Sequence, residues 1–202
     1  WQTRAARSDS SAGGKRDCGG DEDHLRVDSL RSVMNQFSNG AFNFVDKSVV
    51  LGENVQVWHY AVLLADCVIG NNVSIGSRAE VGRGTKIGDG SRIGSGVFLP
   101  SNSIVGKQVF IGPNTTMCDD RHPFAGNVSY VAEPPILEDF CSVGAGCVLL
   151  PGVRIGKKAM VGAGAVVTKD VPAGSVVYGK AAEVRQYTFG HLRREYGWIG
   201  GP

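Results

Sequence analysis

The sequence predicts an all-β fold in which short parallel strands wind into a triangular prism of about six coils. A large aliphatic residue recurs at every sixth position from Val45 to Met117, and the spacing resumes from Leu137 to Val167. A period of six suits a coil in which each short strand points one large side chain at the axis. At about 4.8 Å per stacked strand, six coils rise to about 30 Å. The aliphatic positions are Val45, Leu51, Val57, Leu63, Ile69, Ile75, Val81, Ile87, Ile93, Leu99, Val105, Ile111, Met117, Leu137, Val143, Leu149, Ile155, Val161 and Val167.

The other positions of the six-residue repeat support the same coil. With the aliphatic residue counted as position 1, position 5 is small or β-branched except at Arg121, as a narrow interior requires. Position 2 is most often glycine, as at Gly52 and Gly144. We expect these glycines to take unusual backbone angles at a tight bend. Each coil contacts only its neighbours, so stability grows as coils are added.

The chain divides into three regions. Residues 1–44 begin polar and glycine-rich, and we expect them to be largely disordered or to include a short helix. Residues 45–180 form the prism, with an excursion over residues 123–136 where the repeat is interrupted. Residues 181–202 are rich in aromatic side chains. We expect them to form a short helix and tail that cover the open end of the prism, because the last coil of a solenoid needs a cap.

Composition disfavours several kinds of partner. The formal charge of +2 gives no basis for binding nucleic acid or a membrane surface. No apolar run approaches the roughly 20 residues of a membrane span, and the start of the chain shows no secretory signal pattern. Five cysteines is an odd number, and Cys67, Cys141 and Cys147 occupy the small interior position. A reduced, cytoplasmic setting fits this usage.

The interruption of the repeat is the first candidate site, because long loops on rigid scaffolds commonly carry function. It begins with Cys118, Asp119, Asp120, Arg121 and His122. An imidazole suits removal of a proton from an attacking amine or hydroxyl, and Asp119 or Asp120 could orient the ring. The alternative is a loop histidine that only bonds a backbone carbonyl. We interpret Cys118 as structural or site-lining, because a nucleophilic cysteine needs an adjacent base.

Three runs resemble the hexapeptide-repeat acyltransferases, in particular the sugar and nucleotide-sugar acetyltransferases. They begin Cys67-Val-Ile-Gly-Asn-Asn, Cys147-Val-Leu-Leu-Pro-Gly and Met160-Val-Gly-Ala-Gly-Ala. The resemblance covers about residues 46–185. It implies a left-handed parallel β-helix, acetyl-CoA as co-substrate, and a homotrimer whose cofactor groove lies between two prisms. Handedness does not follow from the period itself, since most parallel crossovers are right-handed.

The resemblance also assigns candidate residues. The segment from Pro113-Asn114 to His122-Pro123 matches the loop root of sugar- and antibiotic-acetylating relatives, whose histidine is the general base. The residues that match the coenzyme A contacts are Gly144, Ala145, Gly162, Ala163, Thr168, Lys169 and Arg185. The glycines have an equally good structural explanation in the repeat, whereas Lys169 offers an ammonium for the adenosine phosphates. Glu183 stands where these relatives usually have an arginine, which departs from the phosphate-binding pattern.

Substrate choice is the least determined part. Val57-Trp58-His59-Tyr60 resembles an Ile-Trp-His-Phe run in the branch that N-acetylates nucleotide-linked amino sugars. These aromatics can contact substrate or can cap the start of the prism. The asparagine pair that approaches substrate in that branch has no counterpart in Ile93–Val97.

Four functional hypotheses follow. The first is acetyl transfer from acetyl-CoA to an amino sugar carried on a nucleotide, with His122 as base and a backbone amide near Gly144 or Ala145 stabilising the oxyanion. The second is O-acetylation of a sugar hydroxyl. The third is a non-catalytic β-helix scaffold subunit, which would use neither His122 nor Lys169. A zinc-dependent carbonic anhydrase of the γ class shares the coil but needs three zinc-binding histidines. The chain has only His24, His59, His122 and His191, and two of these lie outside the prism. We therefore expect no metal site.

Overall fold

The computed structural model describes residues 37–180 and 183–185 of the 202-residue chain. All of the described residues belong to one compact unit of the chain. The described residues form strands, turns and bends and contain no helix, so none of them forms a helix that could cross a membrane. The expected disorder or helix within residues 1–36 lies outside the described residues.

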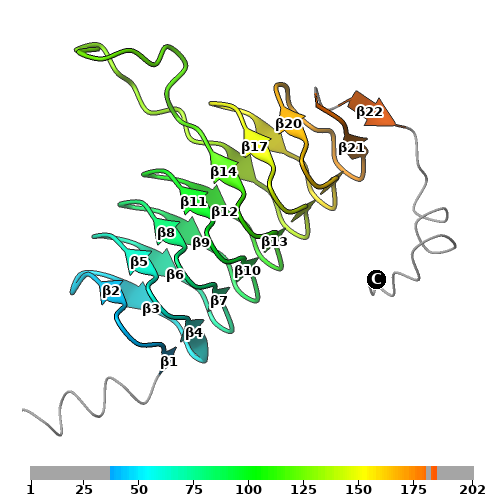
Figure 1. The fold of residues 1–202 in the computed structure, drawn as a ribbon. Coiled ribbons are helices and arrows are strands. Elements are labelled where there is room, and N and C mark those ends of the chain that lie inside the picture. Colours follow the sequence, from blue (N-terminus) through cyan, green and yellow to red (C-terminus); the bar gives the residue numbers. More distant parts are fainter. Residues whose placement is uncertain (1–36, 181–182, 186–202) are drawn as a thin grey trace, which may run out of the picture. The chain divides into compact units, whose positions relative to one another are not determined.

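The strands stack into three sheets, parallel except for β22, which form the three faces of a prism (Figure 1). The first face, in spatial order, contains β1 (Phe37–Asn39), β4 (Val55–Val57), β7 (Ser74–Ile75), β10 (Arg92–Ile93), β13 (Phe110–Ile111), β16 (Ser142–Val143), β19 (Met160–Val161), β21 (Val176–Tyr178) and β22 (Glu183–Arg185). The second face contains β2 (Phe44–Val45), β5 (Val62–Leu63), β8 (Glu80–Val81), β11 (Phe98–Leu99), β14 (Thr116–Met117), β17 (Val148–Leu149) and β20 (Val166–Val167). The third face contains β3 (Val50–Leu51), β6 (Val68–Ile69), β9 (Lys86–Ile87), β12 (Ile104–Val105), β15 (Ile136–Leu137) and β18 (Arg154–Ile155).

From β1 to β20 consecutive strands lie on consecutive faces, so the chain visits the faces in a fixed order. We call the turn from the first to the second face the first corner, the next turn the second corner, and the turn back to the first face the third corner. Outside the excursion the coils up to β19 take 18 residues each, as the pairing of Arg92 with Ser74 and Phe110 shows. The last coil is shorter: Met160 pairs with Val176, 16 residues further on. The parallel β-helix predicted from the sequence is confirmed.

The structure has about seven coils, one more than the sequence predicts. The additional coil begins at β1, which pairs in parallel with β4. Asn39 lies opposite Val57 and so occupies the position of the aliphatic residue. The aliphatic period therefore begins only at Val45, although backbone pairing has already started.

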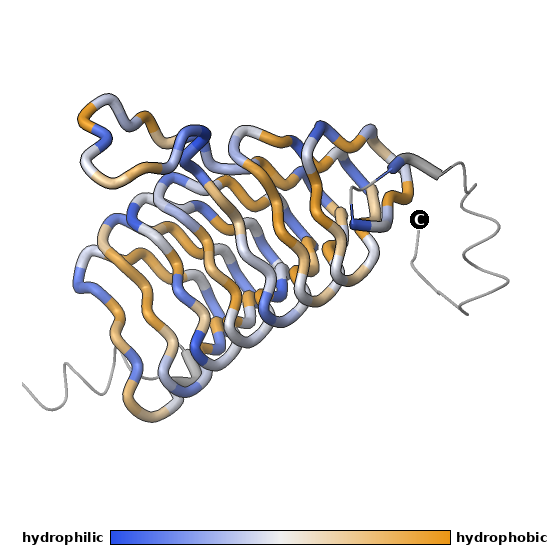
Figure 2. Tube along the Cα trace, turned by 45° about the horizontal axis from the view of Figure 1, so that its top comes forward, coloured by the Kyte–Doolittle hydropathy of each residue, from blue (hydrophilic) through white to orange (hydrophobic). Residues whose placement is uncertain are grey.

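The core runs along the axis and consists of positions 1 and 5, as predicted. Outward and inward residues alternate along each coil, and Figure 2 shows the resulting alternation of hydrophilic and hydrophobic segments. Four buried hydroxyls occupy position 5, and each donates to a backbone carbonyl, as Ser91 does to Gly106 at 2.8 Å and Thr115 to Gly144 at 3.0 Å. These small polar side chains are therefore satisfied where the interior narrows.

The glycines at position 2 correct one sequence expectation. They do not adopt positive φ; the left-handed residues lie at position 4, such as Asn54 with φ 54° and Gly90 with φ 68°. Glycine is needed at position 2 because the next coil passes directly over it. A Cβ on Gly88 would lie 2.6 Å from the carbonyl carbon of Gly106. The repeat thus uses glycine for close approach of two backbones rather than for a special backbone angle.

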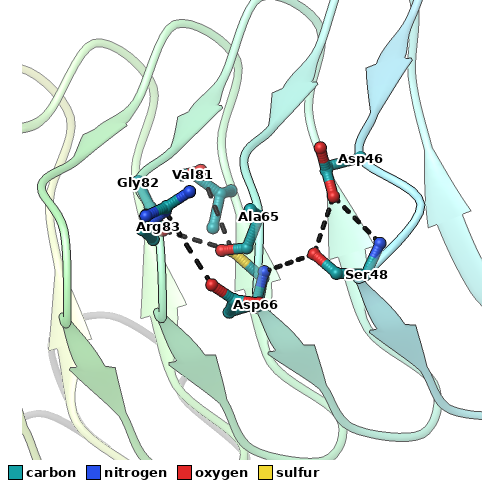
Figure 3. Close-up of polar contacts among 8 residues, drawn as sticks. Asp46, Ser48, Ala65, Asp66, Val81, Gly82 and Arg83 are labelled. Atoms are coloured by element: carbon teal, nitrogen blue, oxygen red, sulfur yellow. Dashed lines mark hydrogen bonds and ion pairs between the residues drawn. The ribbon is translucent and has the colours of Figure 1, made fainter.

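Polar side chains join adjacent coils at the corners. At the second corner, Asp46 accepts from the Ser48 hydroxyl at 2.6 Å, and Ser48 accepts from the Asp66 amide at 2.8 Å (Figure 3). Asp66 then approaches the Arg83 guanidinium at 3.8 Å. The hydrogen bonds that Asp46 accepts lower its pKa. These contacts tie each turn to the next one along the axis.

The C-terminal end differs in part from the expected cap. Glu183–Arg185 form β22, which runs antiparallel to β21 and adds a strand to the first face. Because this strand pairs its backbone with β21, these three residues are not helical. The helix expected within residues 181–202 otherwise lies outside the described residues and stays a prediction.

Candidate functional site

A long excursion leaves the prism at the second corner, directly after β14 (Figure 1). The chain takes 20 residues from Met117 to Leu137, whereas other neighbouring core positions are six residues apart. Backbone bonds close the root of this loop: Glu133 donates to Asp119 at 2.8 Å, and Gly152 donates to Glu133 at 2.6 Å. The loop therefore returns to the next face without disturbing the stacking of the coils.

One ion pair fixes the same root. Arg121 Nη2 lies 2.5 Å from Glu133 Oε2 and also donates to the Pro151 carbonyl at 3.2 Å. The hydrogen bond from Arg121 lowers the pKa of Glu133, and Glu133 in turn raises the pKa of Arg121. The exception at position 5 of the repeat is thereby explained, because Arg121 points to the loop root instead of the core.

Replacing Glu133 by glutamine should loosen this root. The pKa of Glu133 is lowered in the folded state. The carboxylate therefore contributes fully to stability above the ordinary carboxyl pKa of 4.5, and this contribution is lost as pH falls through the lowered pKa. The pair is about half exposed, so we expect only about a two- to fivefold faster hydrogen exchange at the Gly152 amide. The control Glu138→Gln breaks a similar pair with Arg154 at another corner and should leave this amide unchanged. Equal exchange in both variants would contradict a role for the ion pair.

His122 lies at the root of the loop and is exposed. Its backbone is held on both sides: its amide donates to Asp120 Oδ1 at 2.8 Å, and its carbonyl accepts from Asn127 Nδ2 at 3.3 Å. Asp119 Oδ2 accepts from the Tyr130 hydroxyl at 2.6 Å, a bond that raises the pKa of Tyr130 to about 12. Both carboxylates therefore hold the loop in this structure, and their predicted role in orienting the imidazole stays a prediction.

The predicted Gly-Ala turns lie at the first corner, in two successive coils. The Gly144 amide donates to the Val161 carbonyl at 2.8 Å, and the Gly162 amide donates to the Val177 carbonyl at 2.8 Å, so both serve the backbone ladder. The amides of Ala145 and Ala163 have no partner among the described residues, and both residues are exposed. These two amides are available to a ligand that passes along the corner.

Amides at the third corner behave differently. The Asn71 amide donates to Asp89 Oδ1 at 2.9 Å, and the Lys107 amide donates to Asp139 Oδ1 at 2.9 Å. The bond from the Asn71 amide, together with the nearby Lys107 side chain, lowers the pKa of Asp89. Side chains of the next coil thus occupy these two donors, unlike the amides of Ala145 and Ala163.

Thr168 and Lys169 lie at the second corner, after β20, on the same edge of the prism as His122. Both are exposed, and the Lys169 ammonium forms no ion pair with a described residue. Arg185 ends β22 on the first face. Hence the predicted residues fall into two groups, with the Gly-Ala turns on one edge and His122 and Lys169 on the next. The second face separates the two groups. The six residues that cross this face span up to about 20 Å when extended, which is the largest separation between the two edges.

The aromatic run near the first coil is largely used in packing. His59 Nδ1 accepts from the Ala41 amide at 2.8 Å, and the Tyr60 ring stacks on Phe42 with centroids 5.5 Å apart. Trp58 remains half exposed and donates to the Ser74 hydroxyl at 3.3 Å. His59 and Tyr60 therefore cap the start of the prism, while Trp58 faces outward over the first face.

The cysteines are free thiols in the part of the chain that the structure describes. Cys67, Cys141 and Cys147 lie in the core, and burial raises the pKa of each. Burial also raises the pKa of Cys118, which fits a site-lining residue better than a nucleophile. Residues 37–180 and 183–185 contain no group of three His, Cys, Asp or Glu side chains suited to a metal ion.

A groove of about 750 Å³ lies on the first face, across β4, β7, β10 and β13. Its lining includes Trp58, Ser74, Arg92, Phe110 and Pro113. The six-residue repeat gives no signal for this groove, because the residues that project from one face recur every 18 positions rather than every six. A search for aromatic and charged side chains at that longer spacing would have brought Arg92 and Phe110 together, since they are paired neighbours.

Comparisons with known proteins agree with this architecture. The bacterial transferase hexapeptide family (six repeats) matches residues 48–83, 84–119 and 134–169, and a hexapeptide repeat of succinyl-transferase matches residues 67–100. A curated relative is 2,3,4,5-tetrahydropyridine-2,6-dicarboxylate N-acetyltransferase of Staphylococcus aureus, 46% identical over 79 residues. That match spans 39% of this chain and only 30% of the relative.

Two solved structures resemble this chain, and the first of them shows the same fold. UDP-N-acetylglucosamine acyltransferase from Campylobacter jejuni is 18% identical with a TM-score of 0.52, and the match covers 79% of this chain and 78% of that one. A perosamine N-acetyltransferase mutant from Caulobacter crescentus, in complex with CoA and GDP-perosamine, is 24% identical with a TM-score of 0.46. There the match covers 82% of this chain and 66% of that one.

Proposed function

Because this chain belongs to the bacterial transferase hexapeptide family, whose repeats match more than half of its residues, we propose that it is an acetyl-CoA-dependent acetyltransferase. The observation that carries the proposal is an exposed histidine at the root of the long loop, on a prism whose neighbouring edge presents unoccupied backbone amides. The curated relative is named an N-acetyltransferase, which supports an amine as acceptor. The resemblance of the Trp58 segment supports an amino sugar carried on a nucleotide.

The described residues fit acetyl-CoA as co-substrate. Pantetheine carries amide groups that need donors, and the Ala145 and Ala163 amides supply two on one edge of the prism. The Gly144 amide is already bonded to Val161, so Ala145 is the better candidate for the oxyanion. Lys169, whose ammonium pairs with no described carboxylate, can bind phosphate. Thr168 and Arg185 stay candidates on the basis of the resemblance.

The proposed reaction is a direct transfer. Acetyl-CoA supplies the acetyl group as a reactive thioester. The His122 imidazole accepts the proton of the acceptor amine as nitrogen attacks the carbonyl carbon, so that a C–N bond forms and the C–S bond breaks. The Ala145 amide donates to the carbonyl oxygen as negative charge develops on it. The imidazolium then returns the proton to the departing sulfur, and the base is restored.

A second copy of the chain completes the site in this proposal. His122 and Lys169 lie on one edge of the prism and the Gly-Ala turns on the next, with the second face between them. One bound molecule reaches both groups when the second corner of one copy faces the first corner of another. A homotrimer satisfies this requirement three times by rotation. The buried free thiols support a reducing, cytoplasmic location.

The first test is calorimetric titration of acetyl-CoA into the assembled protein. Micromolar binding at about one site per chain is the expected result. A folded, assembled sample that produces no heat would overturn the transferase and favour the scaffold subunit. Transfer to a hydroxyl in place of an amine is the remaining alternative, and the pH dependence of a His122→Ala variant separates the two.

Lys169 offers a sharper test of how coenzyme A is held. Lys169→Gln should weaken coenzyme A binding about 10-fold or more, because it removes a charge from a phosphate contact. The matched control is Lys47→Gln, which changes the same repeat position at the same corner but near the other end of the prism. Coenzyme A affinity should be unchanged in that control. Equal affinities in all three proteins would remove Lys169 from the site.

A further inference from the structure

The groove on the first face has the chemistry of a binding site rather than of a bare sheet. Among the described residues that line it, Arg92 is the only charged side chain and no carboxylate is present. Arg92 is exposed and forms no ion pair within the described part of the chain. An unpaired guanidinium over a groove without acids attracts an anion, and its planar donors suit phosphate or carboxylate.

Aromatic and small polar side chains flank this charge. Ser74 and Phe110 pair with Arg92 from either side, so the three side chains project in a row about 5 Å apart. The Trp58 indole is held over Ser74 by its hydrogen bond. Trp58 is 50% and Phe110 is 41% exposed, which leaves ring faces for stacking. Asn72 and Gln56 add amide groups to the same groove.

The groove also continues into the predicted acetyl-CoA edge. A Cβ on Gly94 would lie 2.6 Å from the Pro113 nitrogen, so the two turns are in direct contact. In the next coil, the Gly146 amide donates to the Pro113 carbonyl at 2.8 Å. The rim of the groove at Pro113 is thus one coil away from the Ala145 amide. A molecule in the groove would lie beside the place where the acetyl group is expected.

We infer that this groove holds the acceptor, and that Arg92 selects acceptors which carry a phosphate or a carboxylate. That the bound molecule is the acceptor rests on the proposed function. The anion-binding site itself does not depend on that function. The ring of the acceptor stacks against Trp58, while its anionic group reaches Arg92. Arg92 is a specificity-determining residue in this arrangement and takes no part in proton transfer.

The test measures anion binding without coenzyme A. Uridine diphosphate and glucuronate are titrated into the assembled protein, with uridine and glucose as uncharged matches, and binding is followed by calorimetry. Tryptophan fluorescence is compared with that of Trp58→Phe to assign any quenching. If the inference holds, one charged probe binds and quenches the fluorescence of Trp58. The uncharged match of that probe binds at least about 10-fold more weakly. Arg92→Gln lowers the affinity for the charged probe about 10- to 100-fold. The probe that binds distinguishes phosphate from carboxylate.

The matched control is Lys86→Gln, which removes a cation from the outward position of β9, the strand before β10, on the third face. It should bind every probe as the unmodified protein does. If the unmodified protein binds neither anion, or if Arg92→Gln binds them equally well, the inference is wrong. A change in oligomeric state in Arg92→Gln would instead identify the groove as a contact between copies and would also overturn it. Acetyl-CoA is titrated into the same samples. Its binding reports on the transferase proposal alone, so failure of that proposal can be told apart from failure of the anion site.

Discussion

Replacing His122 by alanine is expected to lower the rate constant of acetyl transfer about 10²- to 10⁴-fold while leaving acetyl-CoA affinity unchanged. The magnitude is that of a general base positioned on the reacting proton. The side chain is exposed and the loop is fixed through backbone atoms and the Arg121–Glu133 pair, so the variant should fold normally. The measurement is kcat and KM in the unmodified protein and the variant, with affinity from calorimetry.

The pH profile of the His122→Ala variant identifies the acceptor atom. An amine loses its proton unaided at high pH, so transfer to nitrogen should recover as pH rises. A hydroxyl does not ionise in that range, and transfer to oxygen should stay low at every pH. The control is His59→Gln, which removes the other described histidine and should keep full activity, because His59 only accepts from the Ala41 amide. A His122→Ala enzyme with unchanged kcat at neutral pH would exclude this residue as the base.

Replacing Gly88 by alanine is expected to cost about 3 kcal/mol of unfolding free energy, although it adds a single methyl group. That methyl would lie 2.6 Å from the Gly106 carbonyl carbon and 2.7 Å from the Lys107 nitrogen. Both atoms belong to the backbone of the next coil, so relief requires the two coils to separate. Overpacking of this kind typically costs about 1–3 kcal/mol and occasionally more. Thermal and denaturant unfolding of the assembled protein measure the loss.

The control for this prediction is Gly174→Asn at the same corner. Gly174 adopts φ 69°, a Cβ added to it would meet no atom within 4 Å, and asparagine already adopts this backbone region at Asn54 and Asn72. Its unfolding free energy should change by less than about 1 kcal/mol. If Gly88→Ala is as stable as this control, close approach of the coils is not what requires glycine at position 2.

The fold was largely predictable because its period is short and its core simple. One aliphatic residue in six fixes which side chain points inward, and the same rule holds from Val45 to Val167. The rule does not detect strands that pair without an aliphatic residue, which is why β1 with Asn39 and the antiparallel β22 were missed. The rule also gave the wrong reason for the glycines at position 2. They are required by contact with a coil 18 residues further along the chain, and such a contact leaves no signal in the neighbouring sequence.

The candidate site was predictable in its parts but not in its arrangement. The sequence places His122 at the start of an interruption, and in the structure His122 lies between β14, which ends at Met117, and β15, which begins at Ile136. Which corner each residue occupies depends on counting strands, and that count separates Lys169 from Ala145. Likewise, the bond from Tyr130 to Asp119 depends on how the loop folds back and could not be inferred from residue order.

The 18-residue coil also limits how insertions and deletions can change this protein. Adding or removing a whole coil shifts everything beyond it by one strand spacing, about 4.8 Å, and leaves every side chain on its original face. Adding six residues instead rotates the following chain by one face, which would move the loop that carries His122 to a different edge. Insertions and deletions that preserve activity should therefore occur in multiples of 18 within the coils from β1 to β19, or inside the excursion between β14 and β15, where extra residues alter neither height nor rotation.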